Sequence, residues 1–362
     1  MKRFLLCLLS ITLAFTLFLT GCTACSGCSG DSTLYFSNSF TGQWGGSNTN
    51  PTEYYEKLTY DVSYTDNYQN GLIKKGSALQ NLLNCDFTGD YTTILEVGGA
   101  NLLSERANLS NLPETITDRE VYKYTTTLNI TATIDGKEYN DQNVTECYFF
   151  ANDISFNPIY SHTLSINTYV MLSPSSQFAT TRKAYEYETF YNTNNYTIIK
   201  QALELDENGL TGNVLGTSVS TNEYEFRTLI DNNQLIFALR NFQSLPNQFT
   251  VLGVVSPAYN QSKNISVLQQ ALYDYNTELT YNSKTSDYVI PIKRINFAVA
   301  SDTYTGIAQY LCLQQAEVTD VNGNNPIKNH VLPVEYAFPI STSGTFSCLG
   351  AIVCNLKSVT IN

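Results

Sequence analysis

The chain has 362 residues, of which 43% are hydrophobic and 14% are charged, and 32 acidic residues against 20 basic ones give a formal net charge of −12. This hydrophobic content is enough for a packed core, which excludes a wholly disordered chain. The acidity argues against nucleic acid as a partner, because binding it requires a basic surface. It also opposes direct contact between the body of the protein and an anionic membrane.

The N-terminus has the layout of an export signal. Lys2 and Arg3 precede an apolar run from Phe4 to Thr20, which ends just before Cys22. A positive end, a short apolar stretch and small residues are typical of a secretory signal peptide. The run is at the lower limit for a membrane-spanning helix, which normally takes about 20 residues. An uncleaved membrane helix is therefore the weaker interpretation.

The tetrad Leu19-Thr20-Gly21-Cys22 resembles the lipobox of bacterial lipoproteins. The resemblance covers only the first 22 residues, but it is specific, because an apolar residue, a small residue and a cysteine must coincide at the end of the apolar run. It implies cleavage between Gly21 and Cys22 and attachment of lipid to the Cys22 sulfur. Two acyl chains hold a protein firmly, whereas one gives only marginal anchoring. We therefore expect a lipid-anchored protein on the extracytoplasmic face of a cell membrane.

A spacer follows the expected anchor. Its Ser, Gly, Thr and Asn residues cannot bury enough apolar surface to fold, so it is predicted to be flexible. Two Tyr-rich segments, Lys57–Tyr68 and Lys183–Tyr196, could mark related halves with a seam at Ser173–Ser176, but we favour shared composition as the reason for their similarity. The predicted organisation is a signal peptide (1–21), a lipidated tether (22–50), a first β region (51–172) and a second β region (173–362), the last two forming either one domain or two.

The sequence of the body predicts antiparallel β-structure. Val121 to Ile134 alternates with period 2, and its even-numbered residues, among them Tyr122 and Tyr124, form the apolar face. Asp135-Gly136 then predicts a tight hairpin turn. Further strands are predicted at Leu58–Tyr64, Tyr91–Val97, Thr163–Met171, Ala184–Tyr191, Thr197–Leu203, Glu223–Ile230, Leu235–Phe242, Phe249–Val255, Tyr288–Ile292, Ile295–Ala300 and Gly350–Ile361.

Signs of helix are sparse. Val267 to Tyr275 has apolar residues at helical spacing, whereas Asp231–Gln234 looks like a hairpin loop between two strands. Many short strands joined by Asn, Gly and Asp turns favour antiparallel β over alternating β and α. We therefore predict a mainly β fold of antiparallel sheets, as a β-sandwich or a curved half-barrel, with one or two short helices.

Catalytic and metal-binding motifs are lacking. The two histidines, His162 and His330, both look like turn or strand-start residues with structural roles. Asp320–Asn325 resembles the start of a calcium loop but lacks the glycine and the glutamate that such a loop needs, so a plain turn is expected. Cys22, Cys25 and Cys28 have a spacing found in metal sites, but lipid takes the first and no fourth ligand follows nearby. No catalytic residue, metal or cofactor is assigned.

Tyrosine is unusually abundant, with 26 residues against one tryptophan. The rings could form a stacking surface for sugars or peptides, but we favour the simpler interpretation that they cover the outer face of a sheet.

Five cysteines remain in the body, four of which suggest disulfide pairs. Cys312–Cys354 and Cys85–Cys147 would be ordinary pairings, although connectivity cannot be read from sequence. Buried free thiols are the alternative interpretation.

Two classes of function follow. The first is a non-enzymatic lipoprotein that binds a glycan, a peptide, a lipid or another envelope protein. An apolar concave pocket would favour a lipid ligand, and an exposed row of tyrosines a glycan or protein ligand. The alternative is a surface hydrolase that uses carboxylates or a metal, whose sign would be acids, or histidine and acids, converging in a cleft.

Overall fold

The computed structural model describes residues 54–65, 85–99, 101–104, 120–134, 136–150, 157–172, 178–207, 209–224, 230–240, 247–259, 261–299, 309–314, 317–327, 331–341 and 348–362. The predicted signal peptide with Gly21, the lipid site at Cys22, the tether, the seam at Ser173–Ser176 and His330 lie outside these residues.

The described strands belong to one sheet. They are β1 (Tyr54–Thr65), β2 (Cys85–Gly98), β3 (Val121–Ile134), β4 (Lys137–Phe150), β5 (Pro158–Leu172), β6 (Phe178–Tyr191), β7 (Asn195–Asp206), β8 (Gly209–Glu223), β9 (Ile230–Asp231), β10 (Gln248–Ser256), β11 (Gln261–Tyr281), β12 (Lys284–Val299), β13 (Gln309–Gln314), β14 (Pro333–Ser341) and β15 (Cys348–Ile361). Short helical segments are α3 (Asn101–Ser104), α4 (Asn232–Ala238) and the 3-10 turn η5 (Pro257–Tyr259).

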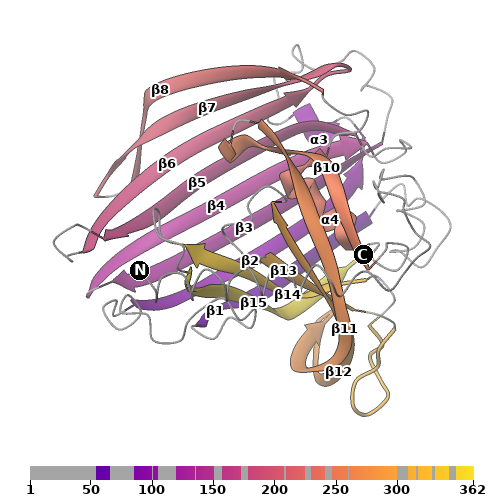
Figure 1. Cartoon of the computed structure of the whole chain (residues 1–362). Helices are drawn as coiled ribbons and strands as arrows, with labels where there is room; N and C mark the ends of the chain where they lie inside the picture. The colour runs from indigo at the N-terminus through magenta and orange to yellow at the C-terminus, as the bar shows by residue number, and fades with distance from the viewer. Residues whose placement is uncertain are drawn as a thin grey trace, which may run out of the picture. The chain divides into compact units, whose positions relative to one another are not determined.

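The sheet runs in the order β8-β7-β6-β5-β4-β3-β2-β1-β15-β14-β13-β12-β11-β10-β9 (Figure 1). All neighbours are antiparallel except β9 and β10. Thr280 and Tyr281 of β11 also pair in parallel with Ser358 and Val359 of β15. Because β11 to β15 are also successive neighbours in the sheet, this pairing closes them into a ring. The mainly β prediction is confirmed: the described strands form one large, mainly antiparallel sheet in which β11 also pairs with β15. Because the described strands form a single sheet, a sandwich of two separate sheets does not apply.

Both predicted β regions contribute to this sheet. β5, from the first region, pairs with β6, from the second, in an unbroken register from Tyr160 opposite Phe190 to Leu172 opposite Phe178. β1, from the first region, pairs with β15, at the other end of the chain.

The β3–β4 hairpin forms where the sequence predicts it. Ile134 lies opposite Lys137, and Gly136 adopts φ of 77°, a conformation that suits glycine. Tyr122 and Tyr124 are buried, as the predicted alternation requires.

The strand predicted at Leu235–Phe242 and the loop predicted at Asp231–Gln234 are wrong. Asp231 instead caps α4: its carboxylate accepts the backbone N–H of Asn233, and the Gln234 side chain reaches back to the Asp231 backbone. This capping box satisfies N–H groups that the first helical turn leaves without partners. The apolar run that follows was ambiguous because Leu235, Phe237, Ala238 and Leu239 are all buried, which is compatible with a strand or a helix.

The helix predicted at Val267–Tyr275 is also wrong, because this segment lies inside the long strand β11. Ile265 and Val267 are buried whereas Ser266 and Leu268 are exposed, which is the alternation of a strand. β11 pairs with β10 on one side and with β12 on the other. Hydrogen bonding to two neighbours overrides the helical spacing of its apolar residues.

The face of the sheet that contacts α4, here called the helix face, carries the main hydrophobic core. Tyr122 and Tyr124 of β3 and Phe149 of β4 contact Phe237 of α4, with ring centroids 5.2–6.2 Å apart. Since successive side chains of a strand alternate between faces, the register then assigns each neighbouring residue to the helix face or to the opposite face.

None of the helices in the described ranges has the length and hydropathy of a membrane span.

Candidate functional site

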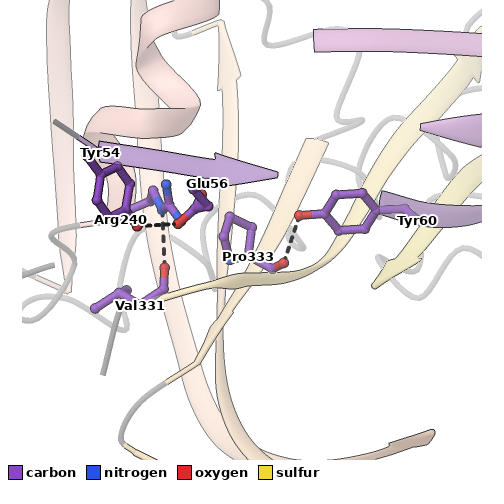
Figure 2. A network of polar contacts seen from close by, with 6 residues as sticks. All are labelled: Tyr54, Glu56, Tyr60, Arg240, Val331 and Pro333. Carbon is purple, nitrogen blue, oxygen red and sulfur yellow. Dashed lines mark hydrogen bonds and ion pairs between the residues drawn. The ribbon is translucent and has the colours of Figure 1, made fainter. Parts of the chain in front are cut away.

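A buried ion pair joins the segment just after α4 to β1 (Figure 2). The Arg240 guanidinium donates two hydrogen bonds to the Glu56 carboxylate, at 2.8 and 2.9 Å, and the two side chains are only 2% and 1% exposed. Arg240 also donates from Nε to the Val331 carbonyl at 3.2 Å, and the Tyr54 hydroxyl donates to Glu56 at 3.0 Å. Burial lowers the pKa of Arg240, but the carboxylate of Glu56 opposes this and the net shift is upward. The network therefore keeps an ion pair in the core, where solvent and dissolved ligands do not reach it.

Nearby, the Tyr60 hydroxyl donates to the Pro333 carbonyl at 2.9 Å, so β1 is tied a second time to the segment that begins at Val331 (Figure 2). These contacts identify the network as a structural lock between β1, α4 and the residues that lead into β14.

Glu56→Gln is expected to lower the free energy of unfolding by about 3–5 kcal/mol, because it leaves the buried Arg240 charge without its counter-charge. The double variant Glu56→Gln/Arg240→Met should recover part of this loss. Urea denaturation followed by circular dichroism measures both. Asp61→Asn makes the same chemical change in the same strand at an exposed pair with Lys357, so its unfolding midpoint should stay at the wild-type value. Equal effects of Glu56→Gln and Asp61→Asn would contradict the assignment.

A second buried cluster surrounds Asp231, which is fully buried. Its carboxylate accepts the Ser161 hydroxyl at 2.7 Å, the Tyr191 hydroxyl at 2.5 Å, and two N–H groups of Asn233. Burial raises the pKa of Asp231, although the four hydrogen bonds act in the opposite direction. The three partner residues belong to β5, β6 and α4, so the cluster docks the start of the helix on the sheet.

Most of the tyrosines whose side chains the structure describes are buried, which overturns the interpretation that they cover an outer face. Tyr60, Tyr91 and Tyr336 contact one another with ring centroids 5.2–5.3 Å apart. Burial raises the pKa of each of these hydroxyls well above its ordinary value of 10.0. The strands bring together rings that are far apart in sequence, and the rings fill the volume that aliphatic side chains fill in other cores.

These shifts predict a cooperative alkaline transition. A hydroxyl whose native pKa is raised contributes stability that is complete below its unfolded pKa, near 10, and that is lost as the pH rises through the native pKa. We therefore expect the buried tyrosines to ionise together with unfolding, so that tyrosinate absorbance and circular dichroism change at the same pH. Gradual ionisation of all tyrosines with the circular dichroism intact would contradict this.

The predicted disulfides do not form among the cysteines whose side chains are described. Cys147, Cys312 and Cys354 are buried free thiols, whereas the side chain of Cys85 lies outside the described set. Burial raises the pKa of Cys312 to about 12 and that of Cys147 well above its ordinary range. Thiols that resist ionisation are poor nucleophiles, which agrees with the alternative interpretation of structural cysteines.

His162 lies within β5, not at a turn or a strand start, and it belongs to a polar row on the face opposite the helix face. Its Nε2 is 2.7 Å from Glu186 Oε1, and on the neighbouring strands Lys123 lies 3.5 Å from Glu146. The side chain of the preceding residue, Ser161, points to the helix face, where it binds Asp231.

This row does not complete a nucleophile–base pair within the described ranges. The other ring nitrogen of His162, Nδ1, is buried without a hydrogen-bond partner. The same ranges hold no group of three or more His, Cys, Asp or Glu side chains arranged for a metal ion. The geometry is that of a ladder of charged and polar pairs across β3–β6, which stabilises adjacent strands.

The helix face of β6 and β7 offers a different arrangement, here called the platform: Tyr185, Tyr187 and Lys200. Both rings project from β6 on the same side as Tyr191, with centroids 6.0 Å apart. The Lys200 ammonium lies 4.3 Å from the Tyr185 ring centroid and 5.6 Å from that of Tyr187. Tyr187 is buried, but Tyr185 and Lys200 are half-buried and reach solvent.

Small polar residues surround the platform. Thr163 of β5 lies opposite Tyr187, and Ser165 lies opposite Tyr185 and accepts a hydrogen bond from Asn167 at 2.6 Å. Aromatic faces, hydroxyl groups and an ammonium ion are the groups that bind a polar ligand with flat apolar patches and a negative charge.

Sequence reasoning did not single out any of the residues of the lock or the platform. Glu56 and Arg240 are separated by 184 positions, and no local pattern links them. The Tyr185-x-Tyr187 spacing carried a usable signal, because it places two rings on one face of a strand. The position of Lys200 beside these rings could be found only from the β6–β7 register, which places Lys200 opposite Tyr187.

The chain matches no protein-family model, and no curated protein matches it in sequence. Among solved structures it is similar to a β-barrel-like protein of the domain of unknown function DUF1849 from Brucella abortus. The TM-score is 0.41 and the sequence identity 9%, over 85% of this chain and 98% of that one.

Proposed function

We propose that the protein is a lipid-anchored lipoprotein of the bacterial cell envelope, whose β-barrel-like domain binds a ligand and is not an enzyme. The observation that carries the anchoring is the tetrad Leu19-Thr20-Gly21-Cys22 at the end of a positively led apolar run. Acylation of Cys22 would supply the membrane affinity that an acidic body lacks.

For the ligand we propose an acidic glycan, bound at the platform. Tyr185 would contact the apolar face of a sugar ring, and Lys200 would pair with a carboxylate or another acidic group. Thr163 and Ser165 would add hydroxyl groups at hydrogen-bonding distance from a polyhydroxylated chain. The half-buried position of Tyr185 beside a lysine, on a protein of net charge −12, is the feature that favours this ligand over a peptide or a lipid.

The alternative of a surface hydrolase has less support. The histidine–carboxylate row around His162 has no nucleophile bound to the free ring nitrogen among the described residues.

Substitution of the anchoring cysteine tests the first part. Cys22→Ser should move the protein from the detergent-rich phase to the aqueous phase in a detergent phase-separation assay, or leave it with an uncleaved signal peptide. Cys25→Ser, three residues further along the chain, is the matched control and should stay in the detergent phase. Mass spectrometry of the wild-type chain should show acylated Cys22 as the first residue. An unmodified Cys22 in the native protein would refute the anchor.

Binding to an array of acidic and neutral oligosaccharides tests the second part. Tyr185→Ala and Lys200→Ala should each weaken binding of acidic oligosaccharides by about fivefold or more, because each removes a contact worth about 1 kcal/mol or more. Lys137→Ala is the matched control, since Lys137 lies 5.3 Å from the ring centroid of Tyr139 in an equivalent pair away from the platform. Equal loss in all three variants, or no binding by the wild-type protein, would contradict the assignment.

A further inference from the structure

One end of the sheet is a long, uncovered strand. Among the strands that the structure describes, β8 pairs only with β7, and it forms the end of the sheet (Figure 1). It has 15 residues, nearly all exposed. Such an edge presents a row of backbone N–H and C=O groups that are free to pair with another strand.

The composition of β8 makes this edge unusual. Large hydrophobic side chains are exposed along it, namely Leu210, Val214, Leu215 and Val219, with exposed fractions of 40%, 49%, 67% and 64%. Natural proteins protect edge strands with lysine, proline or inward-pointing charges. β8 contains none of these, and its only charged residue is Glu223, at its last position.

The opposite end of the sheet does not share this property. There the terminal strand β9 has two residues, Ile230 and Asp231, and both are buried. Gly209 and Gly212 give β8 positive φ angles and register shifts near its start, but the stretch from Gly216 to Glu223 pairs regularly with β7. The regular stretch is therefore the part of the edge that can accept a partner.

We propose that β8 pairs with β8 of a second copy of this chain, antiparallel about a two-fold axis, to form a homodimer with one continuous sheet. Antiparallel pairing of a strand with itself is the isologous arrangement that closes after two copies, so it satisfies both edges without building a fibre. It places Val219 of each copy against Val219 of the other, and so removes from water an apolar side chain that the isolated edge leaves exposed.

The lack of charge on β8 allows a second copy to pair there. A protein of net charge −12 repels itself, so a dimer requires a surface that is free of acidic residues, and β8 is such a surface over all but its last residue. In the antiparallel arrangement centred on Val219, inside the regular stretch, the two Glu223 residues lie at opposite ends of the paired segments. At ~3.4 Å per residue they are separated by about 27 Å, beyond the ~10 Å screening length.

The purified full-length chain in detergent micelles, measured by sedimentation velocity, tests the dimer. The wild-type protein should sediment as a dimer at micromolar concentration. Val219→Lys places like charges at the paired edge and should raise the dimer dissociation constant by about tenfold or more. Val321→Lys is the matched control, because Val321 is 61% exposed in a turn outside the sheet, and it should leave the dimer unchanged.

A scan of single cysteine substitutions from Leu215 to Thr221 tests the geometry separately and does not depend on charge. Only positions near the two-fold axis meet their own counterpart, so disulfide-linked dimers above the background of the parent chain should appear at one or two neighbouring positions. Val321→Cys should give none.

A wild-type monomer would overturn the proposal, and so would a dimer that is insensitive to Val219→Lys and gives no localised crosslink. Capture of an extended peptide by a monomeric chain would show that the edge serves another protein and would also overturn it. Because glycan binding is measured at the platform, on β6 and β7, the two proposals can fail independently.

Discussion

The buried pair of Glu56 and Arg240 is the interaction on which the arrangement of the core depends. It places a charged contact between the first described strand, β1, and Arg240, two residues beyond the end of α4, where both side chains are almost without solvent. Charges in such a position are costly unless they are paired and hydrogen-bonded, so their presence fixes one mutual placement of the two elements. The Val331 carbonyl and the Tyr54 hydroxyl complete the hydrogen bonding and extend this constraint to the segment before β14. Asp231 secures the other end of the same helix to β5 and β6.

Around these two fixed points the core is built to an unusual extent from tyrosine. A tyrosine buries a large ring and still needs a partner for its hydroxyl, and the carboxylates and carbonyls of the core supply partners to Tyr54, Tyr60 and Tyr191. The cost is sensitivity to alkali, since each buried hydroxyl must stay protonated. The same residue type has a different environment on β6, where Tyr185 reaches solvent beside Lys200. Position on the sheet, not residue type, decides whether a tyrosine is enclosed in the core or reaches solvent.

The candidate surfaces lie on neighbouring strands and differ in chemistry. The platform on β6 and β7 combines aromatic, cationic and hydroxyl groups, whereas β8 offers an uncharged backbone edge with apolar side chains. Pairing of two β8 strands would place the platforms of two copies on one extended sheet, with their distance set by the strands between them. A repetitive ligand such as a glycan could then be held at two points, which raises its apparent affinity without a new contact.

The sequence by itself determined the features that depend on local pattern. Alternation identified β3, Asp135-Gly136 identified its hairpin, and the lack of alternating helices and strands identified a mainly β fold. Local pattern failed where two periodicities fit equally well, at the apolar run of α4, and where pairing on both sides made a strand of the helix-like Val267–Tyr275 segment. Only the tertiary structure decided that Glu56 meets Arg240, that the cysteines at 147, 312 and 354 are free, and that β8 ends the sheet with its edge exposed. The physical reason is that strand order and register are non-local: they bring together residues hundreds of positions apart, and the energy of those contacts appears only when the sheet has formed.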